Sequence, residues 1–206
     1  MRKAAAFLLS FLLTMNIYAQ AHDDDDDTPA EPDWEIFIPE LYTRGDQTFM
    51  MSLGLVFPTV FFGPGMDGNR HNLSAIGGGG SLIYTYFLTP NISVGGELGG
   101  TFSGTIGRNN FFMIPIGARI CYQFLVAQRF EIPVTLTMGI NWHRYLDYGY
   151  FGFFMRLGGA VFYRFNTDWS FGVKSSWGWH PQFTGQQGRN VHGNFLDLRF
   201  AARYHF

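Results

Sequence analysis

The 206-residue sequence predicts an all-β fold, an eight-stranded antiparallel up-and-down β-barrel that crosses a membrane with its strands. Residues 196–206 carry the clearest signal, because every second position, from Leu196 to Phe206, is apolar. A period of two residues predicts a strand with one apolar face and one polar face. The sequence ends on this strand with no helix or loop left to cover the apolar face, and we expect a lipid bilayer to cover it.

The composition also favours a membrane barrel. Aromatic residues make up 18% of the chain, with 23 Phe, and charged residues only 15%, whereas a soluble domain usually carries about 25% charged residues. After the N-terminal leader, no segment reaches the roughly 18 consecutive apolar residues of a membrane helix. The hydrophobicity is instead distributed by alternation, which is typical of barrels that cross a membrane.

The first residues form a secretory signal peptide, which we place at 1–21. A short basic start, Met1–Lys3, precedes an apolar stretch, and Ala19-Gln-Ala21 is a small-residue cleavage site. An N-terminal membrane helix is disfavoured because the apolar stretch is too short to span comfortably. Without Arg2 and Lys3, 12 basic residues remain against 16 acidic ones, which argues against nucleic acid as a partner.

Residues 22–45 are expected to form an acidic, largely disordered periplasmic segment. Its Asp23–Asp27 run is expected to be a solvated tail, with divalent-cation binding as the alternative. The apolar patch Trp34–Tyr42 is expected to dock under the barrel, which occupies residues 46–206.

Eight segments of alternating hydrophobicity follow, separated in turn by longer loops and short turns. The expected strands are 47–58, 74–88, 92–103, 111–125, 130–142, 151–165, 169–180 and 196–206. Short turns are expected after the second, fourth and sixth strands, and longer loops after the others, including one at His143–Gly149. An even strand number returns both termini to one side of the membrane.

Outward aromatic residues fall into two bands, as expected for girdles at the two membrane interfaces. The aromatic girdle is predicted at Tyr84, Tyr86, Tyr122, Trp142, Tyr163, Trp169, Trp177 and Trp179. The rival fold is a soluble lipocalin-like barrel, which has an apolar interior and a polar exterior. It is disfavoured because the alternation would place Ile, Leu and Trp outside and arginines inside.

The leader, the eight alternating strands and the terminal aromatic strand resemble the small bacterial outer-membrane barrels, namely the OmpA membrane domain, OmpX and OmpW. The resemblance covers residues 46–206 and is one of pattern. It implies an outer-membrane location in a Gram-negative-type bacterium, with membrane lipid and the β-barrel assembly machinery as partners, and a monomeric state. The assembly signal would be carried by Phe200, Ala202, Tyr204 and Phe206. No residues remain for a peptidoglycan-binding domain like that of OmpA.

Inward-facing charges are the expected candidate site. They are Glu97, Arg119, Arg156, Lys174, Asp197 and Arg199. Glu97 and Arg119 lie on adjacent strands at similar heights and are expected within reach of each other. Eight strands leave an interior just wide enough for side chains, so we expect a salt-bridged plug, with a narrow conduit as the alternative. The expected function is small-solute passage across the outer membrane; the alternative is a surface-interaction or envelope-structural role.

No enzyme, cofactor or metal is expected. The loop-side residues that could serve catalysis are His71, Ser74, His143, Asp147, His180 and His192, and they match no local catalytic motif. The single cysteine, Cys121, excludes an intrachain disulfide and is expected to fill lumen space. Gly77–Gly80 lacks the context of a phosphate loop, and Arg44-Gly-Asp46 would lie on the periplasmic side, so we attribute its adhesion-like spelling to chance.

Overall fold

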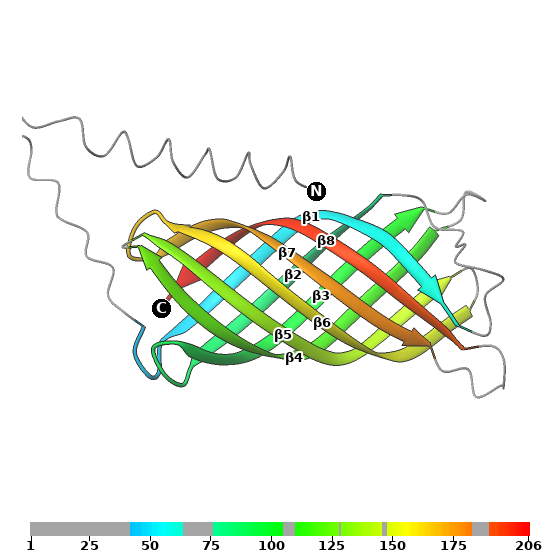
Figure 1. Ribbon diagram of the computed structural model, residues 1–206, viewed down its shortest axis with the longest axis horizontal. Helices are drawn as coiled ribbons and strands as arrows, with labels where there is room; N and C mark the ends of the chain where they lie inside the picture. The colour runs from blue at the N-terminus through cyan, green and yellow to red at the C-terminus, as the bar shows by residue number, and fades with distance from the viewer. Residues whose placement is uncertain (1–41, 64–75, 105–109, 128, 146–147, 183–189) are drawn as a thin grey trace, which may run out of the picture. The chain divides into compact units, whose positions relative to one another are not determined.

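The computed structural model describes residues 42–63, 76–104, 110–127, 129–145, 148–182 and 190–206. These residues form eight antiparallel strands, which confirms the predicted fold class (Figure 1). The strands are β1 (Gln47–Phe62), β2 (Gly77–Phe87), β3 (Ile92–Gly104), β4 (Asn110–Ala127), β5 (Phe130–Tyr145), β6 (Tyr148–Arg164), β7 (Trp169–Gln182) and β8 (Val191–His205). No helix among the described residues is long and apolar enough to span a membrane.

Each strand pairs with its neighbour in sequence, and β1 pairs with β8 to close the barrel. The closing register matches Phe49 with Tyr204 and Leu55 with Leu198. The short connections after β2, β4 and β6 lie at one end, here called the turn side, and the remaining connections lie at the loop side. Figure 1 shows the C-terminus at the turn side.

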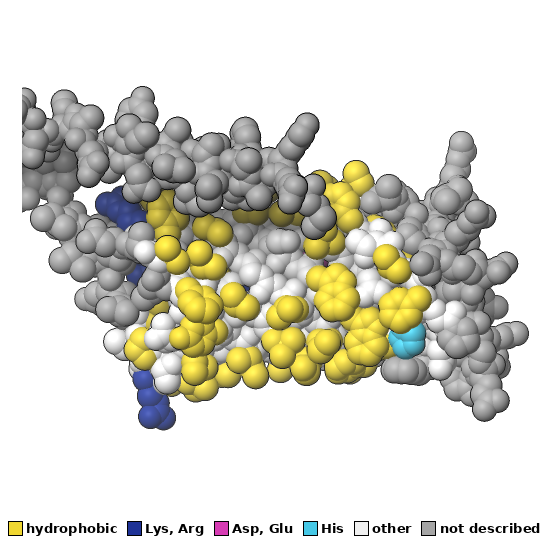
Figure 2. All heavy atoms as spheres, in the orientation of Figure 1, with side chains coloured by type: hydrophobic (Ala, Val, Ile, Leu, Met, Phe, Trp, Pro, Cys, Tyr) yellow, Lys and Arg dark blue, Asp and Glu magenta, His cyan; other side chains and the backbone are white. Residues whose placement is uncertain are grey.

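The alternation of the sequence becomes an apolar outer wall and a polar lumen. Outward residues such as Leu53 and Phe200 are 74% and 76% exposed, whereas the inward Arg199 is 1% exposed. Figure 2 shows hydrophobic side chains covering the wall of the barrel. An exposed apolar surface this continuous belongs in lipid. The soluble lipocalin-like arrangement is therefore ruled out, because it requires the opposite polarity.

The loop expected at His143–Gly149 was wrong. β5 continues to Tyr145 and β6 begins at Tyr148, and these two residues pair with each other. The segment is rich in tyrosine, which favours strands. The pairing of β5 with β6 therefore continues through the polar residues that suggested a loop. Other ends also differ: β1 extends past residue 58 to Phe62, and β8 begins at Val191. The expected start of the second strand, residues 74 and 75, lies outside the described residues.

Two facing glycines accommodate close contacts that a larger residue would obstruct. Gly117 pairs with Gly139 across β4 and β5. A Cβ atom on Gly117 would lie 2.9 Å from Cζ of Phe154, and one on Gly139 would overlap the carbonyl oxygen of Ile116. Glycine at 117 therefore leaves room for the fully buried ring of Phe154, and glycine at 139 allows the close approach of the backbone of β4.

Candidate functional site: the charged lumen

The first part of the site is an ion-pair cluster around Glu97 of β3. Its Oε1 atom accepts from Arg156 Nη1 of β6 at 2.7 Å and from Lys174 Nζ of β7 at 3.4 Å. Thr137 of β5 donates its hydroxyl to Oε2 at 3.3 Å. All these groups are buried, so the carboxylate ties four strands together across the lumen.

A second carboxylate, Asp197 of β8, extends this cluster. Its Oδ2 atom lies 3.1 Å from Arg199 Nη2 and 3.5 Å from Arg156 Nε, and it accepts from Ser176 at 3.2 Å. Arg156 is therefore shared by both carboxylates. We call the resulting chain the central network; it consists of Lys174, Glu97, Arg156, Asp197 and Arg199.

Five of the six charges expected in the lumen thus come together, but Arg119 does not join them. The structure pairs Glu97 with residues of β6 and β7, and among the described residues Arg119 forms no ion pair. The register explains the difference, because Arg119 lies opposite Gly95 and Glu97 lies opposite Gly117. Nε and Nη1 of Arg119 have no hydrogen-bond partner.

A further cluster at the turn side was not foreseen. Glu131 of β5 is held by Arg164 Nε at 3.0 Å, by Arg203 Nη2, and by the phenolic hydroxyl of Tyr42, which donates at 2.8 Å. His205 is within 3.3 Å of the same phenol. We call these five residues the turn-side cluster. The inward positions of Glu131, Arg164 and Arg203 in the alternation were the available signal.

Tyr42 precedes β1 and inserts its ring into the barrel end. The ring stacks on Phe87 with centroids 3.9 Å apart, and the Arg164 guanidinium lies 4.9 Å from its centre. Burial raises the pKa of Tyr42 above its ordinary value, so the phenol stays protonated at neutral pH. The expected docking of Trp34–Tyr42 thus holds for its last residue, and residues 34–41 lie outside the described part.

Aromatic rings fill the lumen toward the loop side. Phe154 stacks on His180 with ring centres 5.6 Å apart. Phe195 meets His180 edge-on at 5.2 Å and stacks on Phe111 at 6.2 Å. His180 Nδ1 is hydrogen-bonded to Asn141 at 2.7 Å. We call Phe111, Phe154, Phe195 and His180 the aromatic layer. Together with the central network, it places buried side chains across the middle and the loop-side part of the lumen.

The residues considered for catalysis are not assembled into a site in the described part of the chain. The rings of His143 and His180 are 6.3 Å apart, and His192 stacks with Trp179. His71, Ser74 and Asp147 lie outside the described residues. Among the described residues, no group of three His, Cys, Asp or Glu side chains is placed to hold a metal ion. Cys121 is buried as a free thiol.

The predicted girdle and assembly residues lie on the outer wall. Trp169 contacts Tyr204, which also meets Phe206 edge-on. Tyr84, Tyr122, Tyr163 and Trp177 are exposed, and Tyr86, Trp142 and Trp179 are half-buried.

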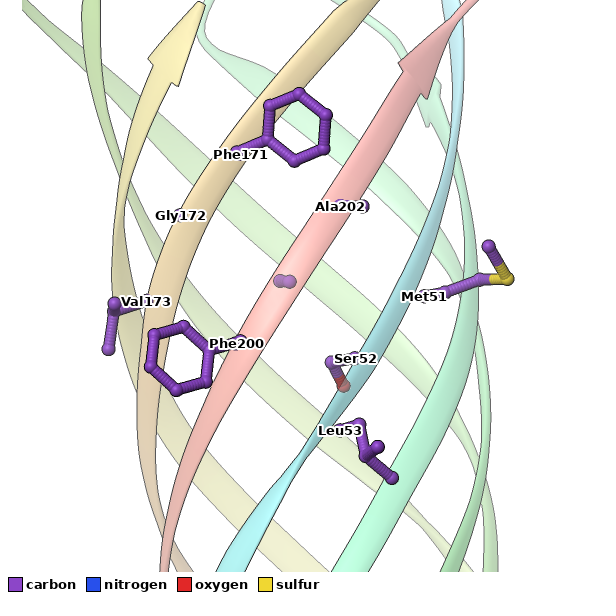
Figure 3. Close-up of a pocket in the computed structure, with 9 residues that line it drawn as sticks. Met51, Ser52, Leu53, Phe171, Gly172, Val173, Phe200 and Ala202 are labelled. Atoms are coloured by element: carbon purple, nitrogen blue, oxygen red, sulfur yellow. The ribbon is translucent and has the colours of Figure 1, made fainter.

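The small Ala202 leaves an apolar groove of about 510 Å³ flanked by Phe171, Phe200 and Leu53 (Figure 3). This groove opens to the lipid side and is separate from the lumen.

Comparisons with known proteins agree with this architecture. A protein-family model matches residues 24–204. An uncharacterized protein of Treponema pallidum (strain Nichols) is 30% identical over 79% of this chain and 78% of its own length. An uncharacterized protein of Borreliella burgdorferi is 26% identical over 59% of this chain and 67% of its own length.

Among solved structures, Neisserial surface protein A matches 79% of this chain and 100% of its own chain, with a TM-score of 0.60 and 12% identity. This likeness concerns the fold, and it confirms the resemblance to small eight-stranded outer-membrane barrels. The extent of the family-model match and of the Treponema pallidum match identifies this chain as a member of the same protein family as that Treponema pallidum protein, with the fold of a transmembrane β-barrel.

Proposed function

We propose that this protein resides in the outer membrane and controls the passage of small solutes, with the central network as its closed gate. The observation that carries the proposal is the central network itself. Barrel interiors can be closed by apolar packing, yet here Arg156 is shared by Glu97 and Asp197, with Lys174 as a second partner for Glu97. Shared partners allow ion pairs to be exchanged without leaving any charge alone.

The location is supported by the apolar wall, the predicted signal peptide and the fold shared with Neisserial surface protein A. The outward row of Phe200, Ala202, Tyr204 and Phe206 supports a further partner, the β-barrel assembly machinery, which would read this terminal strand. The barrel closes on itself and supports a monomer in lipid. No catalytic role is proposed.

Single-channel recording on refolded protein in planar lipid bilayers tests the gate. Wild-type protein is expected to show brief, low-conductance openings. Arg156→Ala removes the cation shared by Glu97 and Asp197, and we expect longer or larger openings. Arg144→Ala is the matched control, because Arg144 lies on β5 but is exposed near the loop side. Conductance at baseline for both the wild type and Arg156→Ala would contradict passage through the lumen.

The alternative is a surface-interaction or envelope-structural role with a permanently closed barrel. The aromatic layer favours it, because Phe154 and Phe195 pack against His180 without an exchangeable charge among them. Antibodies against the loop-side connections decide whether that end is presented on intact cells. Binding together with baseline conductance would favour the alternative over the gate.

A further inference from the structure

The lumen holds an excess of buried positive charge. Among the described residues, six buried cations face it, namely Arg119, Arg156, Arg164, Lys174, Arg199 and Arg203. The buried carboxylates number three: Glu97, Glu131 and Asp197. A wall of apolar side chains surrounds these groups, so lipid supplies no compensating charge. Buried charges that lack partners are strongly unfavourable.

Loss of protons does not remove the imbalance. Arginine keeps its proton in proteins, and five of the six cations are arginines. The described lumen therefore remains positive even when Lys174 is neutral. Tyr42 does not help, because burial raises the pKa of its phenol and keeps it uncharged. An anion or ordered water must therefore meet the unpaired guanidinium groups.

The structure provides an enclosed cavity at Arg119, the buried lumen cation that forms no ion pair among the described residues. This cavity has a volume of about 10 Å³. Its polar lining consists of residues that include Arg119, Ser93, Gln123 and Arg203. Three of these lining residues carry buried polar atoms that have no hydrogen-bond partner in the described part of the chain, namely Nε and Nη1 of Arg119, Nε of Arg203 and the hydroxyl of Ser93. Ser93 is fully buried and Arg119 is 5% exposed.

These unpaired groups are mostly hydrogen-bond donors, which favours an occupant with a negative charge. Three N–H groups and one hydroxyl meet a single unpaired acceptor, Oε1 of Gln123. A volume of this size is at the lower limit for one water molecule. Phosphate, sulfate and a carboxylate substrate are therefore too large, and a halide ion, which is larger than water, requires the side chain of Arg119 or Arg203 to move outward.

We propose that the lumen binds one monatomic monovalent anion, chloride in the cell, at Arg119 beside Ser93 and Arg203. The anion completes the charge balance around Arg119, the cation that Glu97 does not pair with. Binding does not depend on solute passage, because a sealed barrel needs the same compensating charge.

Chloride-dependent stability tests the site. Refolded protein is unfolded by urea at constant ionic strength while gluconate is exchanged for chloride, and the wild-type midpoint is expected to rise and then saturate. Arg119→Met keeps the length of the side chain without its charge, and it is expected to abolish the dependence. Ser93→Ala is expected to shift the saturation to a severalfold higher chloride concentration. A wild-type midpoint that is indifferent to chloride would overturn the proposal.

Bromide provides a direct readout that does not require any variant to fold. Crystals grown in bromide are expected to show an anomalous peak within contact distance of Arg119 Nε or Nη1, and a cavity without such a peak contradicts the site. Cys121→Ser is the second control, since Cys121 lines the same cavity and a thiolate there would be a rival source of negative charge. Chloride dependence that appears only in Cys121→Ser would assign the balancing charge to the thiolate and overturn the proposal.

Discussion

The central network and the turn-side cluster both hold buried carboxylates among arginines, but they are built from different parts of the chain. The central network comes from barrel strands alone and joins two carboxylates through the shared Arg156. The turn-side cluster has one carboxylate, Glu131, and completes its shell with Tyr42, a residue outside the barrel wall. Its arginines lie closer to aromatic rings: Arg164 is 4.9 Å from the centre of Tyr42 and Arg203 is 4.3 Å from that of Phe162, whereas Arg156 of the central network is 5.5 Å from that of Phe154.

This difference teaches how a narrow barrel can accommodate charge in two ways. In the middle of the barrel, neighbouring ion pairs share partners. At the barrel end, an aromatic side chain supplies both a hydrogen bond and a π face, and each contributes to holding a cation. We expect the first arrangement to lose more stability than the second when one carboxylate is neutralised.

The largest expected effect follows from Glu97→Gln. The change keeps the shape of the side chain but leaves Arg156 with only Asp197 and Lys174 with no carboxylate. We expect a loss of about 3–5 kcal/mol in the free energy of unfolding, the usual result of breaking a buried ion pair. Glu131→Gln is the turn-side counterpart. It removes the carboxylate that holds Arg164 and Arg203, but the rings of Tyr42 and Phe162 still face them, and a smaller loss is expected for that reason. Equal losses in urea unfolding of the two refolded variants would contradict the proposed difference.

Tyr42→Phe is expected to have an intermediate effect. The ring can still stack on Phe87, but the hydrogen bond to Glu131 is lost, which costs about 1.5–3 kcal/mol for a bond to a charged group. The raised pKa adds a dependence on pH. Above pH about 10, the unfolded chain loses the phenolic proton while the folded barrel retains it, so stability contributed by Tyr42 falls as pH rises.

The measurement is the unfolding free energy of the wild type minus that of Tyr42→Phe between neutral pH and pH 11. This difference should be constant at neutral pH and should shrink above pH about 10. A difference that stays constant throughout would show that Tyr42 is not the group responsible. The subtraction cancels the titration of the other tyrosines and lysines.

The smallest effects are expected from two serine substitutions, one in each region, which test whether the two regions contribute to stability independently. Ser176→Ala removes a donor to Asp197, and Ser170→Ala removes the 2.7 Å bond to His205 Nε2. Each is expected to cost about 1 kcal/mol. In a double-mutant cycle, Ser170→Ala should couple to Tyr42→Phe by about 0.5 kcal/mol or more, because both contact His205. Ser176→Ala should be additive with Tyr42→Phe, and coupling there would mean that the two regions act as one.

The architecture could be predicted from alternation because each strand is long and each face has a single polarity. The same alternation identified which charges point inward, including all five residues of the central network. Pairing was less accessible, since Glu97 reaches across the lumen to β6 and β7 instead of to Arg119 on the neighbouring β4. Contacts across a barrel depend on the tilt and stagger of the strands, which local patterns do not contain.

Tyr42 was harder still to foresee as a member of the turn-side cluster. It precedes the first strand, where the sequence has no periodicity that assigns it a face. The one available clue was that Glu131 lies inward near two arginines and requires further hydrogen bonds when buried. The connection between β5 and β6 was missed for a related reason, because polar residues near Tyr145 suggested a loop although the tyrosines extend the ladder.

The pairing of β1 with β8 has a consequence for how the barrel is made. Residues that meet at this seam come from opposite ends of the chain, as Tyr42 and His205 do across 163 positions of sequence. Until the final strand arrives, the growing sheet has two unsatisfied edges, which readily associate with other chains. Joining such distant segments also makes closure slow. We therefore expect the pairing of β1 with β8 to come late in folding, and a chain that lacks β8 cannot form this seam.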